Sequence, residues 1–483
     1  MSSPFLLLVP ILLTSILMSL IILSMILPPS YDNYALLKAG RSMATTVTDV
    51  VGSATLKIMD NFWIYFPLAL IGTWRWAVWI FKRMCAQLYI PIEPDPSCSS
   101  NFSLSIITPV YNENPKMFKT ALESWYFNKP DEIIAVIDQT DIHCIEAFKI
   151  FSRNKASARL IITSKPGKRP ALADGILEAK GKIVALVDSD TIWAPDIKDR
   201  ILAPFKDPRI GGVTMRNHPI ECNSIWQKMT DIFWDMRNFQ DLPSQTAMGS
   251  MLSCLSGRSS LYRRDLILPM LDEFLNEILL GLKKESGEDK CLTRLIQREG
   301  WRTYYQGNAE VYSSASADFK TFWRQRLRWT RNSHNSDLIS LWEGWVWRHP
   351  FLAFYMVDRF IATFTLFLGP IFLGIALYLN QWFIALSIIC LWLLGRGIKI
   401  IPHFKRKPKD ILILPLYIGV NFLIALAKLY ALVTIREQVW IRAEAKHSNR
   451  RQDKKRIFQS IKDMILTSEI IGTIVIFVAY TLR

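Results

Sequence analysis

Two carboxylates, Asp188 and Asp190, stand one residue apart directly after the apolar run 183–187. Divalent hard cations such as Mg²⁺ and Mn²⁺ prefer oxygen ligands, and Mg²⁺ commonly binds one or two carboxylates together with substrate phosphates. A cation at this place would offset the charge that develops on a leaving diphosphate. The alternative is a solvated turn, because isolated D-x-D sequences are common. We favour the metal-bound diphosphate because the pair follows an apolar strand.

A second acidic pair, Glu288 and Asp289, precedes the helical pattern of residues 290–296. A carboxylate at the start of a helix either caps the helix or acts as a general base that takes the proton from an attacking sugar hydroxyl. Direct displacement of a diphosphate with inversion needs such a base and no covalent intermediate. Both acids are therefore candidates for the catalytic base.

Gln325, Arg328 and Trp329 are spaced so that they lie at one end of a helix, on neighbouring positions. Arginine can bind a diphosphate with two parallel hydrogen bonds, glutamine can donate to it, and tryptophan can stack on a sugar. The alternative is a belt of Trp and Arg at a membrane interface. That alternative is the better explanation for the nearby Trp323 and Trp342.

Two further signals are weaker. Lys168 and Arg169 precede a predicted helix, where basic side chains suit a phosphate, although exposed basic turns are common. Asp138 ends an apolar run and either accepts bonds from a nucleobase or ribose or caps a turn.

The elements that must position these residues alternate between strand and helix. Short apolar runs at 104–110, 132–138 and 182–188 predict buried strands, and residues 116–127 and 171–179 predict helices between them. This alternation predicts an α/β domain with a parallel sheet covered by helices on both faces. Ligands bind beyond the carboxyl ends of such strands, which is where the candidate residues stand.

Apolar segments flank this domain at residues 4–27, 62–81, 351–435 and 464–482. A membrane span needs ~20 apolar residues, so we expect an integral membrane protein. The first segment is too long for a usual signal peptide and lacks a basic start, which makes that alternative the weaker one. Four charged residues of the apolar region are costly in lipid and are expected to face a channel or each other, namely Asp358, Arg359, Arg396 and Lys399.

The formal net charge of +16 is explained by basic flanks of membrane helices and by anionic substrates, without a nucleic-acid partner. The positive-inside rule places the α/β domain in the cytoplasm, at the plasma (inner) membrane. Seven cysteines form no C-x-x-C pair, which argues against a zinc site or a disulfide framework. The predicted parts are two N-terminal transmembrane helices (1–84), the cytoplasmic α/β domain (85–317), interfacial amphipathic helices (318–350), a transmembrane channel region whose segment 411–435 is re-entrant or tilted (351–435), and a basic cytoplasmic segment with a last hydrophobic helix (436–483).

Taken together, the motifs resemble processive family 2 glycosyltransferases, the membrane-embedded group of hyaluronan, chitin and cellulose synthases. The resemblance spans roughly residues 60–445 and is strongest to hyaluronan synthases and related capsule synthases. The motifs that carry it lie at residues 108–113, 167–169, 187–191, 254–257, 287–293, 325–329 and 428–434. It implies a GT-A-type domain, which transfers sugars from nucleotide diphosphates, inserted between transmembrane helices.

The resemblance also implies a role for each residue. It makes Asp289 rather than Glu288 the base and gives Asp188 and Asp190 the phosphate and an Mg²⁺ or Mn²⁺ ion. The implied nucleotide-sugar contacts are Tyr111, Glu113, Asp138, Lys168, Arg169, Asp188, Asp190, Gln325, Arg328 and Trp329. The implied acceptor contacts are Cys254, Ser256, Gly257, Arg258 and Trp329.

This chain departs from hyaluronan synthases at two of these positions. Glu288 stands where they typically have Asp, and Arg258 stands where they typically have Pro. The second departure puts the identity of the acceptor in question and suggests a uronate.

The expected function is a processive synthase that joins UDP-sugars, with UDP-GlcA and UDP-GlcNAc as the favoured pair, into a polysaccharide that crosses the bilayer. A monomer is the working assumption. Three alternatives stay open: a homopolymer synthase of the chitin or cellulose kind, a non-processive enzyme that glycosylates a lipid carrier, and a receptor or scaffold that has kept the fold without activity.

Overall fold

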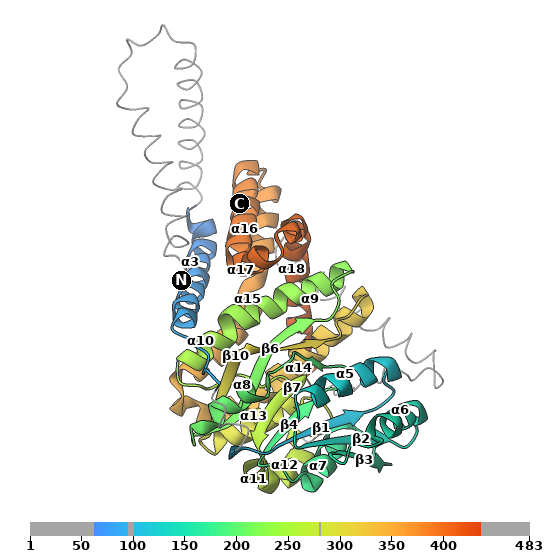
Figure 1. Cartoon of the computed structure of the whole chain (residues 1–483). Coiled ribbons are helices and arrows are strands. Elements are labelled where there is room, and N and C mark those ends of the chain that lie inside the picture. The colour runs from blue at the N-terminus through green and yellow to red at the C-terminus, as the bar shows by residue number, and fades with distance from the viewer. Residues whose placement is uncertain (1–61, 95–100, 280–281, 436–483) are drawn as a thin grey trace, which may run out of the picture. The chain divides into compact units, whose positions relative to one another are not determined.

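The computed structural model describes residues 62–94, 101–279 and 282–435 (Figure 1). These residues fall into two compact units. We call residues 78–367 and 393–435 the sheet unit, and residues 62–77 and 368–392 the helical unit. The predictions for the apolar segment 4–27 and for residues 436–483 lie outside the described residues.

The sheet unit is built on one eight-stranded sheet, whose order is β3-β2-β1-β4-β7-β6-β10-β5. Strands β1 to β4 pair in parallel, and β7 runs antiparallel to both of its neighbours. The strands, in sheet order, are β3 (Ala158–Thr163), β2 (Glu132–Asp138), β1 (Leu104–Val110), β4 (Ile183–Val187), β7 (Ser259–Arg263), β6 (Ile210–Pro219), β10 (Arg302–Ser313) and β5 (Ile192–Trp193). A separate pair consists of β8 (Ile278–Leu279) and β9 (Leu282–Lys283).

The expectation of an all-parallel sheet is wrong in one respect, because the sheet is mixed. The first residue of β7, Ser259, pairs with Val187, the last residue of β4. The chain therefore enters β7 from the carboxyl edge of the parallel strands. A parallel strand would have required a crossover to the opposite edge. Entry from the carboxyl edge brings residues 254–258 beside the residues that follow β4.

Helices cover both faces of the sheet, as the strand–helix alternation predicts. One face packs Phe118, Trp125 and Phe148 against the strands, and the other packs Leu172 and Leu292. The helices of the first face are α5 (Pro115–Phe127), α6 (Ile142–Ser152) and α8 (Lys198–Leu202). Those of the second face are α7 (Lys168–Glu178), α10 (Leu242–Ala247), α11 (Arg264–Ile267), α12 (Leu271–Leu275) and α13 (Glu288–Arg298).

Helix α14 (Phe319–Glu343) carries the Gln325–Trp329 motif and follows β10, the last strand along the chain in the described residues. The side chain of Asp318 caps its first turn by accepting from the Thr321 amide. Its Phe322 packs in an apolar cluster with Ile232 and Tyr417. These residues come from α9 (Ile225–Met236) and α18 (Leu414–Val433). Helix α14 is thus held between the α/β domain and the last described helix.

Among the described residues, three helical segments are long and apolar enough to cross a membrane. They are α15 (Pro350–Tyr378), α16 (Trp382–Lys399) and the segment Pro408–Val433, which joins η5 (Pro408–Ile413) to α18. Helix α3 (Phe62–Gln87) covers the expected second span but is not among these three. The remaining short helices are η1 (Ala203–Lys206), η2 (Arg237–Asp241), η3 (Leu268–Met270), η4 (Trp345–Arg348) and α17 (Ile401–Arg406). Which segments cross, and in which direction, stays a prediction.

Two of the four charged residues in the apolar region, Asp358 and Arg359, form ion pairs with residues outside that group of four. The Lys82 ammonium donates to Asp358 at 2.7 Å, and the Arg359 guanidinium donates to Asp337 at 2.7 Å. Both carboxylates are buried. These pairs satisfy the charges locally, so Asp358 and Arg359 give no support for a charged channel lining.

Candidate active site

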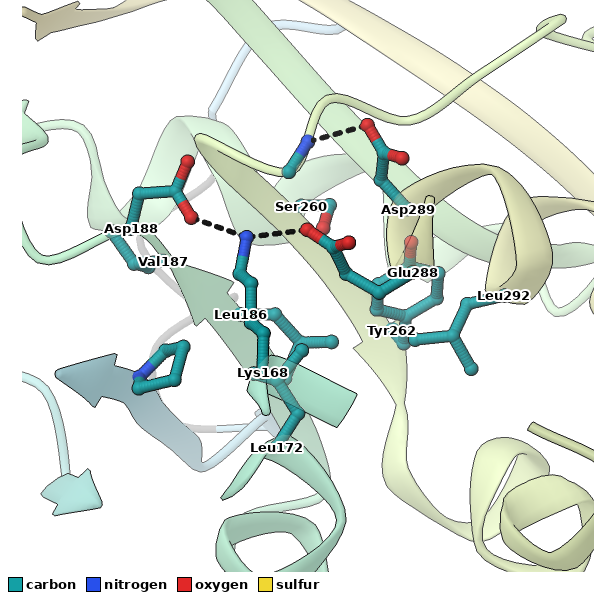
Figure 2. A pocket seen from close by; sticks show the side chains of 12 residues that line it. Lys168, Leu172, Leu186, Val187, Asp188, Ser260, Tyr262, Glu288, Asp289 and Leu292 are labelled. Atoms are coloured by element: carbon teal, nitrogen blue, oxygen red, sulfur yellow. Dashed lines mark hydrogen bonds and ion pairs between the residues drawn. The ribbon is translucent and has the colours of Figure 1, made fainter. Parts of the chain in front are cut away.

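A pocket with an empty volume of about 250 Å³ opens at the carboxyl ends of β1 and β4 (Figure 2). Five segments that are separate in sequence meet there. The pocket is lined by Pro109, Lys168, Leu172, Leu186, Val187, Asp188, Gly257, Ser260, Tyr262, Glu288, Asp289 and Leu292. The predicted residues Lys168, Asp188, Gly257, Glu288 and Asp289 therefore share one site, as the rule for the carboxyl edge of parallel strands requires.

Lys168 joins the two acidic pairs at the centre of this pocket. Its ammonium reaches from the first turn of α7 and donates to Asp188 at 2.6 Å and to Glu288 at 2.5 Å (Figure 2). Burial alone would raise the pKa of Glu288, but the charge and hydrogen bond of Lys168, together with a backbone amide and the charge of Arg328, outweigh burial and lower it. Glu288 is therefore an ionised partner of Lys168, and this contact leaves Asp289 as the better placed base.

Lys168→Met should destabilise the sheet unit by about 3 kcal/mol, because removal of the shared cation leaves two partly buried carboxylates facing each other. The side chains of Lys168 and Glu288 are only 19% and 11% exposed. Thermal unfolding of the purified protein, followed by tryptophan fluorescence, measures the change.

Lys165→Met is the matched control. Lys165 pairs with Asp174 at 2.8 Å, but its side chain is 63% exposed. Exposed pairs contribute ~0–1 kcal/mol, so this variant should unfold close to the wild-type temperature. Equal unfolding temperatures for the two variants would show that Lys168 does not hold the site together.

Asp289 points to the opposite side of the pocket wall from Glu288. Its Oδ2 accepts from the Gly257 amide at 3.3 Å and from the Cys254 thiol at 3.5 Å. Burial, and next the charge of Asp289, raise the pKa of Cys254 to about 12, so the thiol stays neutral. A neutral buried thiol is no nucleophile, which agrees with direct displacement by a deprotonated hydroxyl.

Gly287 allows this turn to form. Its φ of +81° lies in the left-handed region, and an added Cβ would stand 3.0 Å from Cγ of Asn332 on α14. A side chain at this position would therefore be strained and would push against α14. The close approach brings the start of α13, with both acids, next to the helix that carries Gln325 and Trp329.

An acidic cluster lies at the carboxyl edge of the sheet, where Asp188 and Asp190 follow β4 and Glu113 follows β1. The Ser189 hydroxyl donates to Glu113 at 2.9 Å. Burial, and next the charges of Asp188 and Glu113, raise the pKa of Asp190 to about 6. Three carboxylates within electrostatic reach of one another are what a divalent cation relieves, so the residues fit the expected Mg²⁺ or Mn²⁺ ion. Asp190 and Asp188 would hold it.

A second acidic group among the described residues suits a metal less well. His218, Asp231 and Asp235 bring ligand atoms within 4.8 Å of one another. Asp231, however, already pairs with Arg406 at 2.6 Å and with Lys407 at 2.8 Å, and Asp235 pairs with Arg406 at 2.7 Å. These cations neutralise the carboxylates and link α9 to the segment around α17.

The Gln325–Trp329 motif on α14 is also linked to the acidic cluster of Asp190. Ser314 forms a side-chain hydrogen bond to Asp190, and the Ser316 hydroxyl donates to Gln325 at 3.3 Å. The charge of Arg328 helps to lower the pKa of Glu288. The loop after β10 thus connects Asp190 to the Gln325–Trp329 motif.

Trp329 stands against an arginine. The Arg258 guanidinium lies 4.9 Å from the centre of the Trp329 ring and 4.1 Å from that of Trp234 on α9. A cation therefore occupies a face of Trp329 where a sugar was expected to stack. Sequence patterns could not indicate Trp234, because an aromatic residue on an amphipathic helix usually belongs to the core.

Two of the predicted nucleotide contacts, Tyr111 and Asp138, lie at the ends of neighbouring strands. Tyr111 follows β1 and is 36% exposed, and Asp138 ends the neighbouring β2. Asp138 accepts from the amide and the hydroxyl of Thr140, so it also caps a turn, as its alternative interpretation held. Both stand at the carboxyl edge of the sheet, where a nucleoside can reach them.

The prediction for Arg169 needs correction. Its side chain is buried, and its guanidinium donates to Glu277 at 2.7 Å and to the carbonyl groups of Phe274 and Ser286. No donor group is directed at the pocket in these contacts. Arg169 instead anchors Ser286, directly before Gly287, and so positions the start of α13.

Comparison with known proteins agrees with this geometry. Residues 103–332 match the family described as "Glycosyltransferase like family 2". A hyaluronan synthase of Streptococcus pyogenes serotype M1 is 28% identical over 406 residues, which cover 78% of this chain and 93% of that protein. A "Type 2 glycosyltransferase" of Pyricularia oryzae is 26% identical over 381 residues, which cover 72% and 76%.

The fold has a counterpart among solved structures. A mannosyltransferase of Pyrobaculum calidifontis, determined with GDP-Man and Mn²⁺, superposes with a TM-score of 0.50. The match covers 79% of this chain and 97% of that chain at 16% sequence identity, so it speaks for the fold alone. It confirms the expected GT-A-like fold, whose sheet is mixed rather than parallel as predicted.

Proposed function

The chain carries a family 2 glycosyltransferase domain of GT-A-like fold, and on this basis we propose that it is a processive polysaccharide synthase that uses UDP-sugars. The favoured product is hyaluronan or a similar heteropolymer that contains a uronate. The favoured donors are UDP-GlcA and UDP-GlcNAc. The relationship to the hyaluronan synthase of Streptococcus pyogenes, which extends over 93% of that protein, supports this choice.

One observation carries the proposal, namely that the candidate base and the membrane-proximal helix meet at one place. Asp289 is bonded to the Gly257 amide, and the next residue, Arg258, contacts Trp329 of α14. Helix α14 continues through η4 into α15, which is long and apolar enough to cross a membrane. A polymer that grows at Asp289 therefore starts close to the membrane segments, as export during synthesis requires.

The residues assign a simple transfer step. Asp289 takes the proton from the attacking hydroxyl of the acceptor, the hydroxyl oxygen bonds to the anomeric carbon, and the bond from that carbon to the diphosphate breaks. The product is inverted at the anomeric carbon, and UDP leaves. Asp188 and Asp190 would hold a divalent ion, which would supply positive charge to the diphosphate. Lys168 and Arg328 add to that positive charge.

Glu288 and Arg169 act on this step indirectly. Glu288 fixes the ammonium of Lys168, and Arg169 anchors the loop before α13. Cys254 orients Asp289 through its thiol and stays neutral. We infer that the enzyme lies in the plasma membrane with the sheet unit in the cytoplasm, where UDP-sugars are made.

Sealed vesicles test synthesis and export together. The purified protein is reconstituted with the sheet unit facing outward, and both UDP-sugars are added outside. Polymer should accumulate inside the vesicles, where an added polysaccharide lyase digests it only after detergent is supplied. A variant with Asp289→Asn controls for enclosed contaminants. Digestion of all product without detergent would contradict export, and product found only as glycolipid would favour a non-processive enzyme.

A further inference from the structure

Arg258 lies between the segment that follows β4 and the start of α13. Its carbonyl accepts from the Asp188 amide at 3.2 Å, and the preceding amide, that of Gly257, donates to Asp289. Its guanidinium lies over Trp234 at 4.1 Å and over Trp329 at 4.9 Å. The backbone of this one residue therefore contacts the segment after β4 and adjoins the candidate base, while its side chain lies against two indoles, a contact that we call the clamp.

The donors of this guanidinium are nearly unused. Within the described part of the chain, its recorded hydrogen bond runs to the Ser256 hydroxyl at 3.4 Å, and it forms no ion pair. Burial lowers the pKa of Arg258 to about 10, and the nearby charge of Arg237 lowers it too. The charges of Asp188, Asp190 and Asp289 raise this pKa, and Asp188 has the largest effect of the three. A desolvated cation whose partners are too far to bond is costly unless an anion binds it.

A second cation lies on the same side of the site. Arg326 is directed at the rings of Phe233 and Trp329, at 4.5 and 5.2 Å, and its Nε and one terminal nitrogen are buried without a partner in the described residues. The charge of Arg258 helps to lower the pKa of Arg326 to about 9, after burial. Two neighbouring guanidinium groups, neither of which forms an ion pair within the described residues, therefore lie next to the carboxylates of the site.

The clamp restricts which anion Arg258 can bind. Trp234 and Trp329 both lie against its guanidinium, so the donors that remain accessible are those at the planar edge. A planar edge with parallel N–H groups matches a carboxylate, which accepts two coplanar hydrogen bonds. The candidate base Asp289 bonds the amide of Gly257, the residue before Arg258, so this carboxylate would belong to the sugar whose hydroxyl Asp289 deprotonates.

We propose that Arg258 binds the carboxylate of a uronate at the acceptor end of the growing chain and thereby selects acidic acceptors. The inference rests on the proposed function, and it names the chemistry of the sugar that the acceptor site takes. The clamp of Trp234 and Trp329 fixes the fork of Arg258, so that little side-chain freedom is lost on binding. The other oxyanion available to the site is the diphosphate of the donor, and the experiment separates the two.

The experiment compares two oligosaccharide acceptors that differ at the terminal sugar. One ends in a glucuronate and receives GlcNAc from UDP-GlcNAc, and the other ends in GlcNAc and receives glucuronate from UDP-GlcA. Arg258→Gln should raise KM for the glucuronate-ended acceptor by on the order of 10- to 100-fold, as expected for loss of a hydrogen bond to a charged group. KM for the GlcNAc-ended acceptor and the affinity for UDP should change less than about threefold.

A methyl ester of the terminal glucuronate serves as the matched control. The wild-type protein should bind the ester as weakly as Arg258→Gln binds the free acid. Arg258→Gln itself should bind the ester and the free acid with equal affinity. Arg258→Lys keeps the charge but loses the parallel N–H donors of the guanidinium. Its KM for the glucuronate-ended acceptor should therefore lie between the values of the wild type and of Arg258→Gln. Retained UDP binding shows that each variant has folded.

Two results would overturn the proposal. Equal losses for both acceptors, together with weaker UDP binding, would assign Arg258 to the diphosphate. Equal affinity of the wild-type protein for acid and ester would show that the carboxylate is not recognised. Acceptor binding measured by calorimetry without donor needs no turnover. Selective binding of the acid in a protein that transfers nothing would therefore refute the proposed function and leave the role of Arg258 standing.

Discussion

Asp289→Asn should lower sugar transfer by ~10²–10⁴-fold, the usual contribution of a general base, while donor binding stays nearly unchanged. The change removes the proton acceptor but keeps the shape of the side chain. The retained oxygen can still accept from the Gly257 amide, which bonds Asp289 at 3.3 Å in the wild-type protein. Initial rates of UDP release with acceptor and both donors measure transfer, and calorimetry measures donor binding.

Asp265→Asn is a suitable control for this variant, because Asp265 is an exposed carboxylate of α11 that bonds the adjacent Leu266 amide. Its activity should equal that of the wild type. If Asp289→Asn transfers sugar within threefold of the wild type, another group is the base. Glu288→Gln would then be the next variant to measure, although its contact with Lys168 predicts an effect on donor binding rather than on proton transfer.

Asp190→Ala should weaken metal-dependent donor binding by more than ~100-fold, since even the loss of a residue that only orients a metal ligand costs ~10–100-fold. Asp190 is the carboxylate whose pKa is raised to about 6, by burial and then by Asp188 and Glu113. Removal of this charge leaves too few oxygen ligands for the divalent ion. UDP affinity is compared in Mn²⁺ and in EDTA for both proteins.

The wild-type protein should lose most of its UDP affinity in EDTA, and Asp190→Ala should bind UDP equally weakly in both buffers. Asp265→Ala provides the control for loss of a carboxylate elsewhere. A wild-type enzyme that stays fully active in EDTA would disprove the metal role of this cluster.

Sequence patterns predicted where candidate site residues lie in the fold when those residues directly follow a parallel strand. Asp138, Asp188 and Tyr111 each follow an apolar run, and parallel strands bring their carboxyl ends to one edge. Lys168 and Asp289 lie at the starts of α7 and α13, which the helical patterns also indicated. The convergence of Lys168, Asp188 and Asp289 at one pocket follows from topology, of which the strand–helix alternation predicted the parallel part around β1, β2 and β4.

Patterns failed where a contact depends on a partner far away in the chain. Arg169 and Lys168 are adjacent and equally basic, yet one is buried against Glu277, 108 positions along the chain, and the other faces the pocket. The antiparallel entry of β7 was equally hidden, because strand direction depends on the path of residues 220–258. The contact of Arg258 with both Trp234 and Trp329 results from that path.

The most direct test of polymerisation measures the length of the product when the purified protein receives UDP-GlcA, UDP-GlcNAc or both. The account predicts long chains at early times only with both donors present, together with UDP release from each donor in equal amounts. Traces of product from either donor alone should stop after one addition. Long polymer from a single UDP-sugar would contradict a heteropolymer synthase and would favour a homopolymer synthase of the chitin or cellulose kind.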